Sequence, residues 1–238
     1  MTSYEEIVQK EIQMWKKKQL QNPHLMKRMS KNVQNKINSV IPQKIHQAIT
    51  VAIKAFIKSI LTGASVLSRQ AAAPSTLFEQ DQLFREKLAT YQKAAVAEGA
   101  GTGFGGILLG IADFPLLLSI KMKFLYETAA VYGYNPHQYE ERLFLLHIFQ
   151  LAFSNTEKRR ETLEVIENWE IYKHAILDMD WQVFQQEYRD YIDLAKLLQL
   201  IPGFGAIVGA YANHNLMEQL GETAMNAYRM RALHSIGS

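Results

Sequence analysis

The amino-acid sequence predicts an all-α protein, a single multi-helical domain that contains two similar glycine-rich helical units. Three observations indicate this class. Apolar residues recur at helical spacing along most of the 238 residues. No run of β-branched residues is long enough to predict a strand. The hydrophobic fraction of 48% is typical of a chain that buries a core, so extensive disorder is not expected.

The prediction of two related units comes from pairs of similar segments. Gly103-Phe104-Gly105 is matched one hundred residues later by Gly203-Phe204-Gly205, and Glu127-Thr128-Ala129 is matched by Glu222-Thr223-Ala224. Glycine lets helix backbones approach closely. We therefore expect Gly103, Gly105, Gly203 and Gly205 to be structural glycines at close helix crossings.

Charge divides the chain into a basic arm, residues 1–70, and an acidic body, residues 71–238. The first seventy residues hold twelve basic and three acidic side chains, whereas the remainder holds fourteen basic and twenty acidic ones. Such an arm suggests an anionic partner: membrane lipid, nucleic acid, or the body itself. Because the arm contains no recognisable nucleic-acid-reading motif, a nucleic-acid partner is not expected.

The arm is predicted to contain two amphipathic helices. The first spans residues 4–20, with Val8, Ile12 and Trp15 on one face. The second begins near Pro42, where proline is tolerated. Its apolar face is opposed by a stripe of four candidate membrane-contact residues: Lys44, Lys54, Lys58 and Arg69. This composition fits a helix at an anionic interface, and it fits a core helix with a solvated lysine face equally well.

The body is predicted to be helical after a break at residues 71–76. Helices are expected over residues 78–97, 136–153, 157–172, 181–200 and 216–233. The glycine-rich segments 99–118 and 197–215 lie between them. Fourteen uncharged residues in the first segment give a helix of about 21 Å, shorter than the bilayer core of about 30 Å. We expect core packing there, with partial membrane insertion as the alternative.

Motifs for catalysis are weak. The segment 101–106 formally satisfies G-x-G-x-x-G, but a helical pattern precedes it where a dinucleotide site needs a strand. The chain has no cysteine, which excludes thiol chemistry and fits a reducing cytoplasm. Three acids are candidates for a functional role: Asp113, Glu127 and Glu222. The last two occupy matching positions and would form a metal site if they faced each other, although paired helix surfaces explain them as well. No cofactor and no metal is expected.

The segments Glu98–Leu118 and Ile120–Tyr134, and later Leu200–Ala210, resemble the signature of the EcsC family. The resemblance extends over most of the chain, from about residue 5 to about residue 232. It implies a helical protein encoded beside the ATPase and membrane subunits of an ABC transporter. It supplies no catalytic residue set, and genetic neighbourhood does not by itself define a function.

The leading hypothesis is a non-enzymatic, membrane-peripheral accessory protein associated with an ABC transporter system, without an assigned biochemical activity. Its expected partners are an anionic membrane surface and the ATPase or membrane subunit of the transporter. The expected location is the cytoplasm, at the inner face of the cell membrane. The alternatives are a protein that handles lipid or another hydrophobic ligand, and an unrecognised enzyme that uses Asp113, Glu127 or Glu222.

Overall fold

The computed structural model describes residues 3–20, 43–63, 73–102, 106–154, 156–177 and 206–237. Every regular element in these ranges is an α-helix, which confirms the predicted all-α class. The helices are α1 (Ser3–Leu20), α3 (Gln43–Thr62), α4 (Leu77–Thr102), α5 (Gly106–Val131), α6 (Tyr139–Phe153), α7 (Thr156–Glu167), α8 (Trp169–Leu177) and α11 (Ala206–Gly237). Buried apolar residues from all of them form one core, as expected for a single domain.

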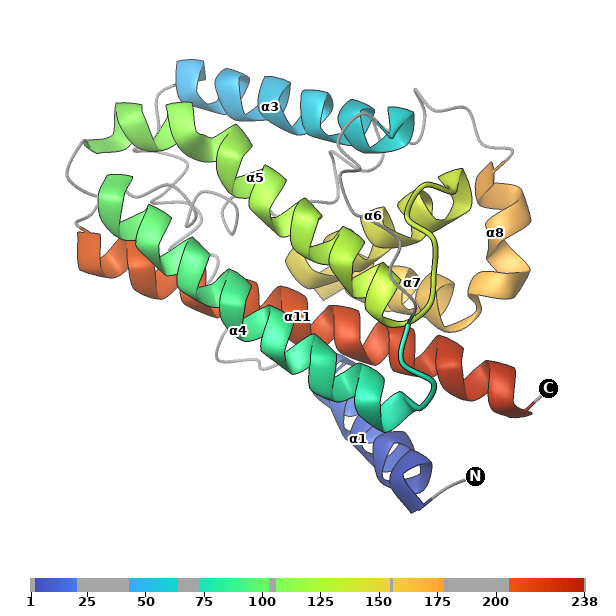
Figure 1. Ribbon diagram of the computed structural model, residues 1–238. Coiled ribbons are helices and arrows are strands. Elements are labelled where there is room, and N and C mark those ends of the chain that lie inside the picture. Colours follow the sequence, from blue (N-terminus) through green and yellow to red (C-terminus); the bar gives the residue numbers. More distant parts are fainter. Residues whose placement is uncertain are drawn as a thin grey trace.

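The long helix α11 is the centre of the packing. It lies alongside α4, and it also contacts α6, α5, α1 and α7 (Figure 1). The contact with α4 is close at Gly221, where an added Cβ would lie only 2.6 Å from a methyl carbon of Leu88. The absence of a Cβ at this position leaves room for the Leu88 side chain of α4.

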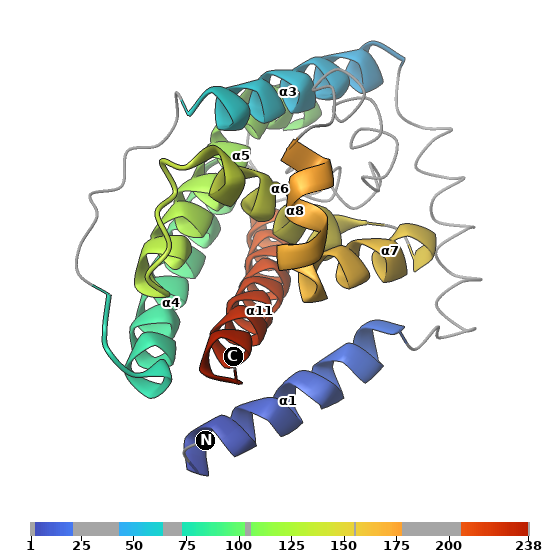
Figure 2. The same ribbon diagram turned by 90° about the vertical axis from the view of Figure 1, so that its right-hand side faces the viewer.

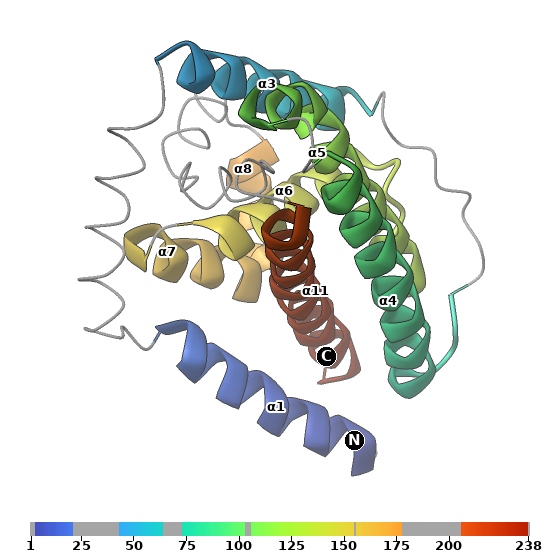
Figure 3. The ribbon, with the colours of Figure 1, turned by 90° about the vertical axis from the view of Figure 1, so that its left-hand side faces the viewer.

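The helices α1 and α3 lie at opposite ends of the molecule. In all three ribbon views α3 is at the top and α1 is at the bottom (Figures 1, 2 and 3). Helix α3 packs on α5 and α6, while α1 packs on α11 and α7. Both helices belong to the predicted basic arm, yet each is held by a different part of the body.

Local sequence fixes the start of α4 and the end of α5. The Thr76 hydroxyl accepts a hydrogen bond from the Glu79 amide at 3.3 Å, and the Glu79 carboxylate accepts one from the Thr76 amide at 3.2 Å. This reciprocal pair is a capping box. Hydrogen bonds from Thr76 keep the pKa of Glu79 below its ordinary value. At the end of α5, Gly133 has a φ of 85°, and the amide of Tyr134 donates to the carbonyl of Ala129 in a Schellman motif.

Helix α6 is buried along nearly its whole length, from Glu141 to Phe153. The expected helix over residues 136–153 is present, although it begins three residues later, at Tyr139. Most of these side chains are apolar, and the polar ones, such as Glu141 and His147, are buried as well, so that α6 needs neighbours on all sides. Helix α6 accordingly lies between α11, α7 and α3.

The four predicted structural glycines, Gly103, Gly105, Gly203 and Gly205, lie outside the described residues. The similarity of the two glycine-rich units therefore stays a prediction. Over the described ranges, no helix combines the length and the apolar character needed to cross a bilayer.

Candidate functional site

The predicted lysine stripe is present on α3 as far as its side chains are described. Lys54 and Lys58 are exposed beside Val51, which is 66% exposed. The opposite face of the helix is buried through Ile53 and Ile57. Because that apolar face packs on α5 and α6, the lysine face of α3 is the one that remains exposed. Lys44 lies within α3 but its side chain is outside the description, and Arg69 lies outside the described residues.

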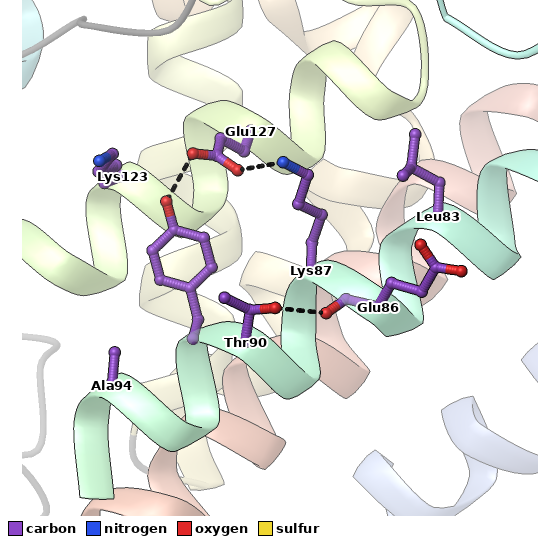
Figure 4. A pocket seen from close by; sticks show the side chains of 8 residues that line it. Leu83, Glu86, Lys87, Thr90, Ala94, Lys123 and Glu127 are labelled. Carbon is purple, nitrogen blue, oxygen red and sulfur yellow. Dashed lines mark hydrogen bonds and ion pairs between the residues drawn. The ribbon is translucent and has the colours of Figure 1, made fainter. Parts of the chain in front are cut away.

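One candidate acid, Glu127, lies in a groove between α4 and α5 (Figure 4). The groove has a volume of about 470 Å³. Its lining mixes apolar, hydroxyl and charged side chains: Leu83, Glu86, Lys87, Thr90, Tyr91, Ala94, Lys123 and Glu127. The α4 residues come from successive turns of one helix face, so that the groove follows the line where α4 meets α5.

Both carboxylate oxygens of Glu127 have partners. The Tyr91 hydroxyl donates to Oε1 at 2.7 Å, and the Lys87 ammonium lies 3.0 Å from Oε2 (Figure 4). Burial alone would raise the pKa of Glu127, but Tyr91, Lys87 and Lys123 together lower it below its ordinary value. Burial and the bond to Glu127 raise the pKa of Tyr91. A general base works best with a pKa near the operating pH, so this arrangement favours a structural role for Glu127.

The other matched acid, Glu222, lies in a different groove. This groove, of about 520 Å³, is bordered by α1, α4 and α11, and its residues are Lys18, Phe84, Arg85, Leu88, Asn215, Glu218, Gln219, Glu222 and Met225. Glu222 pairs with Lys18 at 3.3 Å. The two grooves share no residue, and Glu127 and Glu222 have different partners: Lys87 and Tyr91 for the first, Lys18 for the second. Across the described ranges, no group of three or more His, Asp or Glu side chains is placed to hold a metal ion.

The third candidate acid, Asp113, lies within α5. Its side chain is outside the description, so its predicted role stays a prediction.

Two buried charge networks were not anticipated from the sequence. In the first, the Asp81 carboxylate of α4 accepts hydroxyl bonds from Tyr4 at 2.6 Å and Tyr132 at 2.5 Å. Arg229 of α11 donates to Asp81 at 2.8 Å and to Glu11 at 2.8 Å. Asp81 and Arg229 are 0% and 1% exposed. This network joins α1, α4 and α11 with Tyr132, the residue that follows α5.

The second network is centred on Glu141 of α6. Tyr228 donates a short hydrogen bond to one carboxylate oxygen, and Arg231 donates to the other at 2.8 Å. Burial raises the pKa of Glu141, and Arg231 and Tyr228 oppose that shift. The guanidinium of Arg231 also lies 3.8 Å from the ring centroid of Tyr134. The rings of Tyr132 and Tyr228 stack at 5.2 Å, so the two networks are adjacent.

A signal for these networks exists in the sequence. Asp81 lies four residues after Leu77 and three before Phe84, on the face of the helix that is apolar elsewhere. Glu141 is likewise in register with Leu145 and Ile148. A carboxylate in an apolar stripe predicts a buried, paired charge, because an unpaired one is too costly. The identity of the partner is not predictable in this way, since Arg229 follows Asp81 by 148 residues.

The chain matches the model of the EcsC protein family over residues 6–233. This chain belongs to the EcsC family. It is 46% identical over 234 residues to Protein EcsC of Bacillus subtilis (strain 168), with 98% of each chain covered. It is 26% identical over 248 residues to the uncharacterized protein YdbA of the same organism, with 94% of this chain and 91% of that one covered. No solved structure matches this EcsC family protein.

Proposed function

We propose that this EcsC family protein is a non-enzymatic, membrane-peripheral accessory protein of an ABC transporter system. The observation that carries the membrane contact is the outer face of α3, where Lys54 and Lys58 are exposed next to Val51. Lysines near an anionic surface contribute about 1 kcal/mol each, screened by salt. The excess of positive charge in residues 1–70 supports the same contact.

The non-enzymatic part of the proposal is supported by the chemistry of the two grooves. Glu127 and Glu222 are each paired with a lysine, and the pKa of Glu127 is lowered, which is opposite to the shift that prepares a carboxylate for proton transfer. Within each buried network, the carboxylate is paired with an arginine of the same network. These arrangements favour stable packing over turnover.

The connection to an ABC transporter is supported by the family resemblance. It is tested by co-purification of the tagged protein with the ATPase and membrane subunits of an ABC transporter from the same cells. Recovery of the ATPase or the membrane subunit in stoichiometric amount supports the connection, and a preparation without either subunit contradicts it.

The membrane contact is tested by flotation with vesicles of phosphatidylglycerol and phosphatidylcholine. We expect the wild-type protein to float with these vesicles at low salt, and to float less as salt is raised. The variant Lys54→Glu/Lys58→Glu should bind more weakly. The matched control is Lys93→Glu/Arg160→Glu, which makes the same change in net charge at exposed positions on α4 and α7. Equal binding by the two folded variants would contradict a contact through α3.

A further inference from the structure

The outer face of α1 carries a second surface on which apolar and basic side chains alternate. Ile7, Lys10, Met14 and Lys17 follow one another at spacings of three, four and three residues, which places them on one face of the helix. We call these four residues the α1 stripe. Ile7 and Met14 are 50% and 65% exposed, and both lysines are exposed. The α1 stripe therefore combines apolar and basic side chains on one exposed helix face.

The inner face of α1 is fixed to the body, so the α1 stripe is presented in one orientation. Val8, Ile12 and Trp15 are buried in the common core. Polar contacts hold the helix along its length: Tyr4 with Asp81, Glu11 with Arg229, Lys16 with Glu167 and Lys18 with Glu222. The α1 stripe is therefore the side of a docked helix that remains open.

The charge of this face fits an anionic occupant. Over the described ranges, neither Lys10 nor Lys17 forms an ion pair with another side chain. The Glu11 side chain is 45% exposed but is paired with Arg229, and Glu6 is exposed on this part of the helix. Lysines at an interface keep their ammonium groups at the headgroups, while neighbouring apolar side chains enter the acyl boundary. An anionic bilayer matches both kinds of side chain in the α1 stripe.

The position of α1 makes this surface distinct from that of α3. Figures 1 to 3 place the two helices at opposite ends, with the elements that each packs against lying between them. The open faces of α1 and α3 therefore point away from each other, and one flat bilayer cannot contact both. We infer that the α1 stripe is a second bilayer-contact surface, so that one molecule can bind two apposed anionic membranes. This inference rests on the proposed membrane contact of α3.

The test is vesicle clustering, measured by turbidity and by energy transfer between two populations of labelled vesicles made of equal parts phosphatidylglycerol and phosphatidylcholine. The wild-type protein should cluster them. Lys10→Glu/Lys17→Glu should still float with vesicles through α3 but should not cluster them. Each lysine contact corresponds to about a fivefold change in partitioning, so loss of two should weaken the α1 contact at least about 30-fold.

A second variant, Ile7→Ser/Met14→Ser, leaves the net charge unchanged and should also lose clustering. Lys93→Glu/Arg160→Glu should still cluster vesicles, although its lower net positive charge weakens the overall attraction between the protein and anionic vesicles. Circular dichroism confirms that each variant is folded, and light scattering of the protein alone reports whether it is monomeric.

The outcomes separate this inference from the proposed function. Absence of clustering by a wild-type protein that floats with vesicles overturns the inference and leaves the α3 contact intact. Wild-type clustering by Lys10→Glu/Lys17→Glu also overturns it, because a second copy or another surface must then form the bridge. Loss of clustering in Lys54→Glu/Lys58→Glu, with flotation retained through α1, supports two opposed surfaces. A wild-type protein that does not float contradicts both the proposed function and the inference.

Discussion

The buried histidine of α6 gives the protein a specific response to acid. His147 is enclosed in the core, where its Nδ1–H donates to the carbonyl oxygen of Leu143 at 2.8 Å and its ring lies against Trp169. Burial lowers the pKa of His147 to about 4, from an ordinary value of 6.5. Below pH 6.5 the unfolded chain binds a proton at this position that the folded protein does not bind until about pH 4.

We therefore expect the free energy of unfolding to fall as pH is lowered through this window, and to be fully restored above it. The contribution of His147 is about 3 kcal/mol between neutral pH and pH 4. Urea unfolding at several pH values measures it. His147→Gln cannot titrate, so its stability should depend less steeply on pH than that of the wild-type protein. Parallel pH profiles for the two proteins would rule out a buried neutral imidazole.

The pair of Asp81 and Arg229 gives a second prediction at the residue scale. Arg229→Met leaves the Asp81 carboxylate in the core with only the hydroxyls of Tyr4 and Tyr132 as donors. The expected loss of stability is about 3–5 kcal/mol, because the remaining buried charge is uncompensated. Asp81→Asn/Arg229→Met removes that charge and should recover part of the loss. Chemical denaturation measures the free energy of unfolding of both variants. A double variant no more stable than Arg229→Met would contradict the explanation by an uncompensated Asp81 charge.

At the scale of the elements, the contact between α4 and α11 depends on Gly221. A Cβ at this position would lie 2.6 Å and 2.7 Å from the two methyl carbons of Leu88. Gly221→Ala should therefore lose stability by about 1–3 kcal/mol through overpacking. The better helix propensity of alanine offsets about 1 kcal/mol of this cost, so the expected net loss is about 0–2 kcal/mol.

A double-mutant cycle with Leu88→Ala isolates the contact. Without the leucine methyl groups, Gly221→Ala should become neutral or stabilising, because only the propensity effect remains. Urea unfolding of the four proteins gives the coupling energy. Strict additivity of the two substitutions would mean that Leu88 simply moves into the adjoining groove.

The sequence predicted individual elements better than their partners. Periodicity identified the first helix and its buried residues Val8, Ile12 and Trp15, which the structure confirms. Periodicity depends on local spacing and is therefore visible in the chain itself. It does not reveal that Glu11 on the same helix meets Arg229, or that Glu127 and Glu222 occupy separate grooves. Those facts depend on how helices far apart in the sequence are placed.

At the scale of the whole molecule, the charge asymmetry divides the chain into two parts, whereas the packing joins those parts in one core. Charge predicted an arm of residues 1–70 and a body of residues 71–238. The common core, however, includes Val8, Ile12 and Trp15 from α1 and Ile53 and Ile57 from α3, together with apolar residues of the body. Helices that share one core are expected to unfold together, whereas a separate arm would unfold by itself.

We predict a single cooperative transition in which α1 and the body unfold together. The protein labelled with 5-fluorotryptophan reports this by fluorine NMR, because Trp15 lies on α1 and Trp169 begins α8, and both are buried. During urea titration the native signals of Trp15 and Trp169, assigned among the three tryptophans of the chain by single substitutions, should disappear with the same midpoint and the same slope. Loss of the Trp15 signal at lower urea would instead show that α1 detaches before the body unfolds, in spite of contacts such as that of Tyr4 with Asp81. If the transition is cooperative, Arg229→Met should lower the urea midpoints of both tryptophan signals by the same amount, because the guanidinium connects Glu11 of α1 with Asp81 of α4.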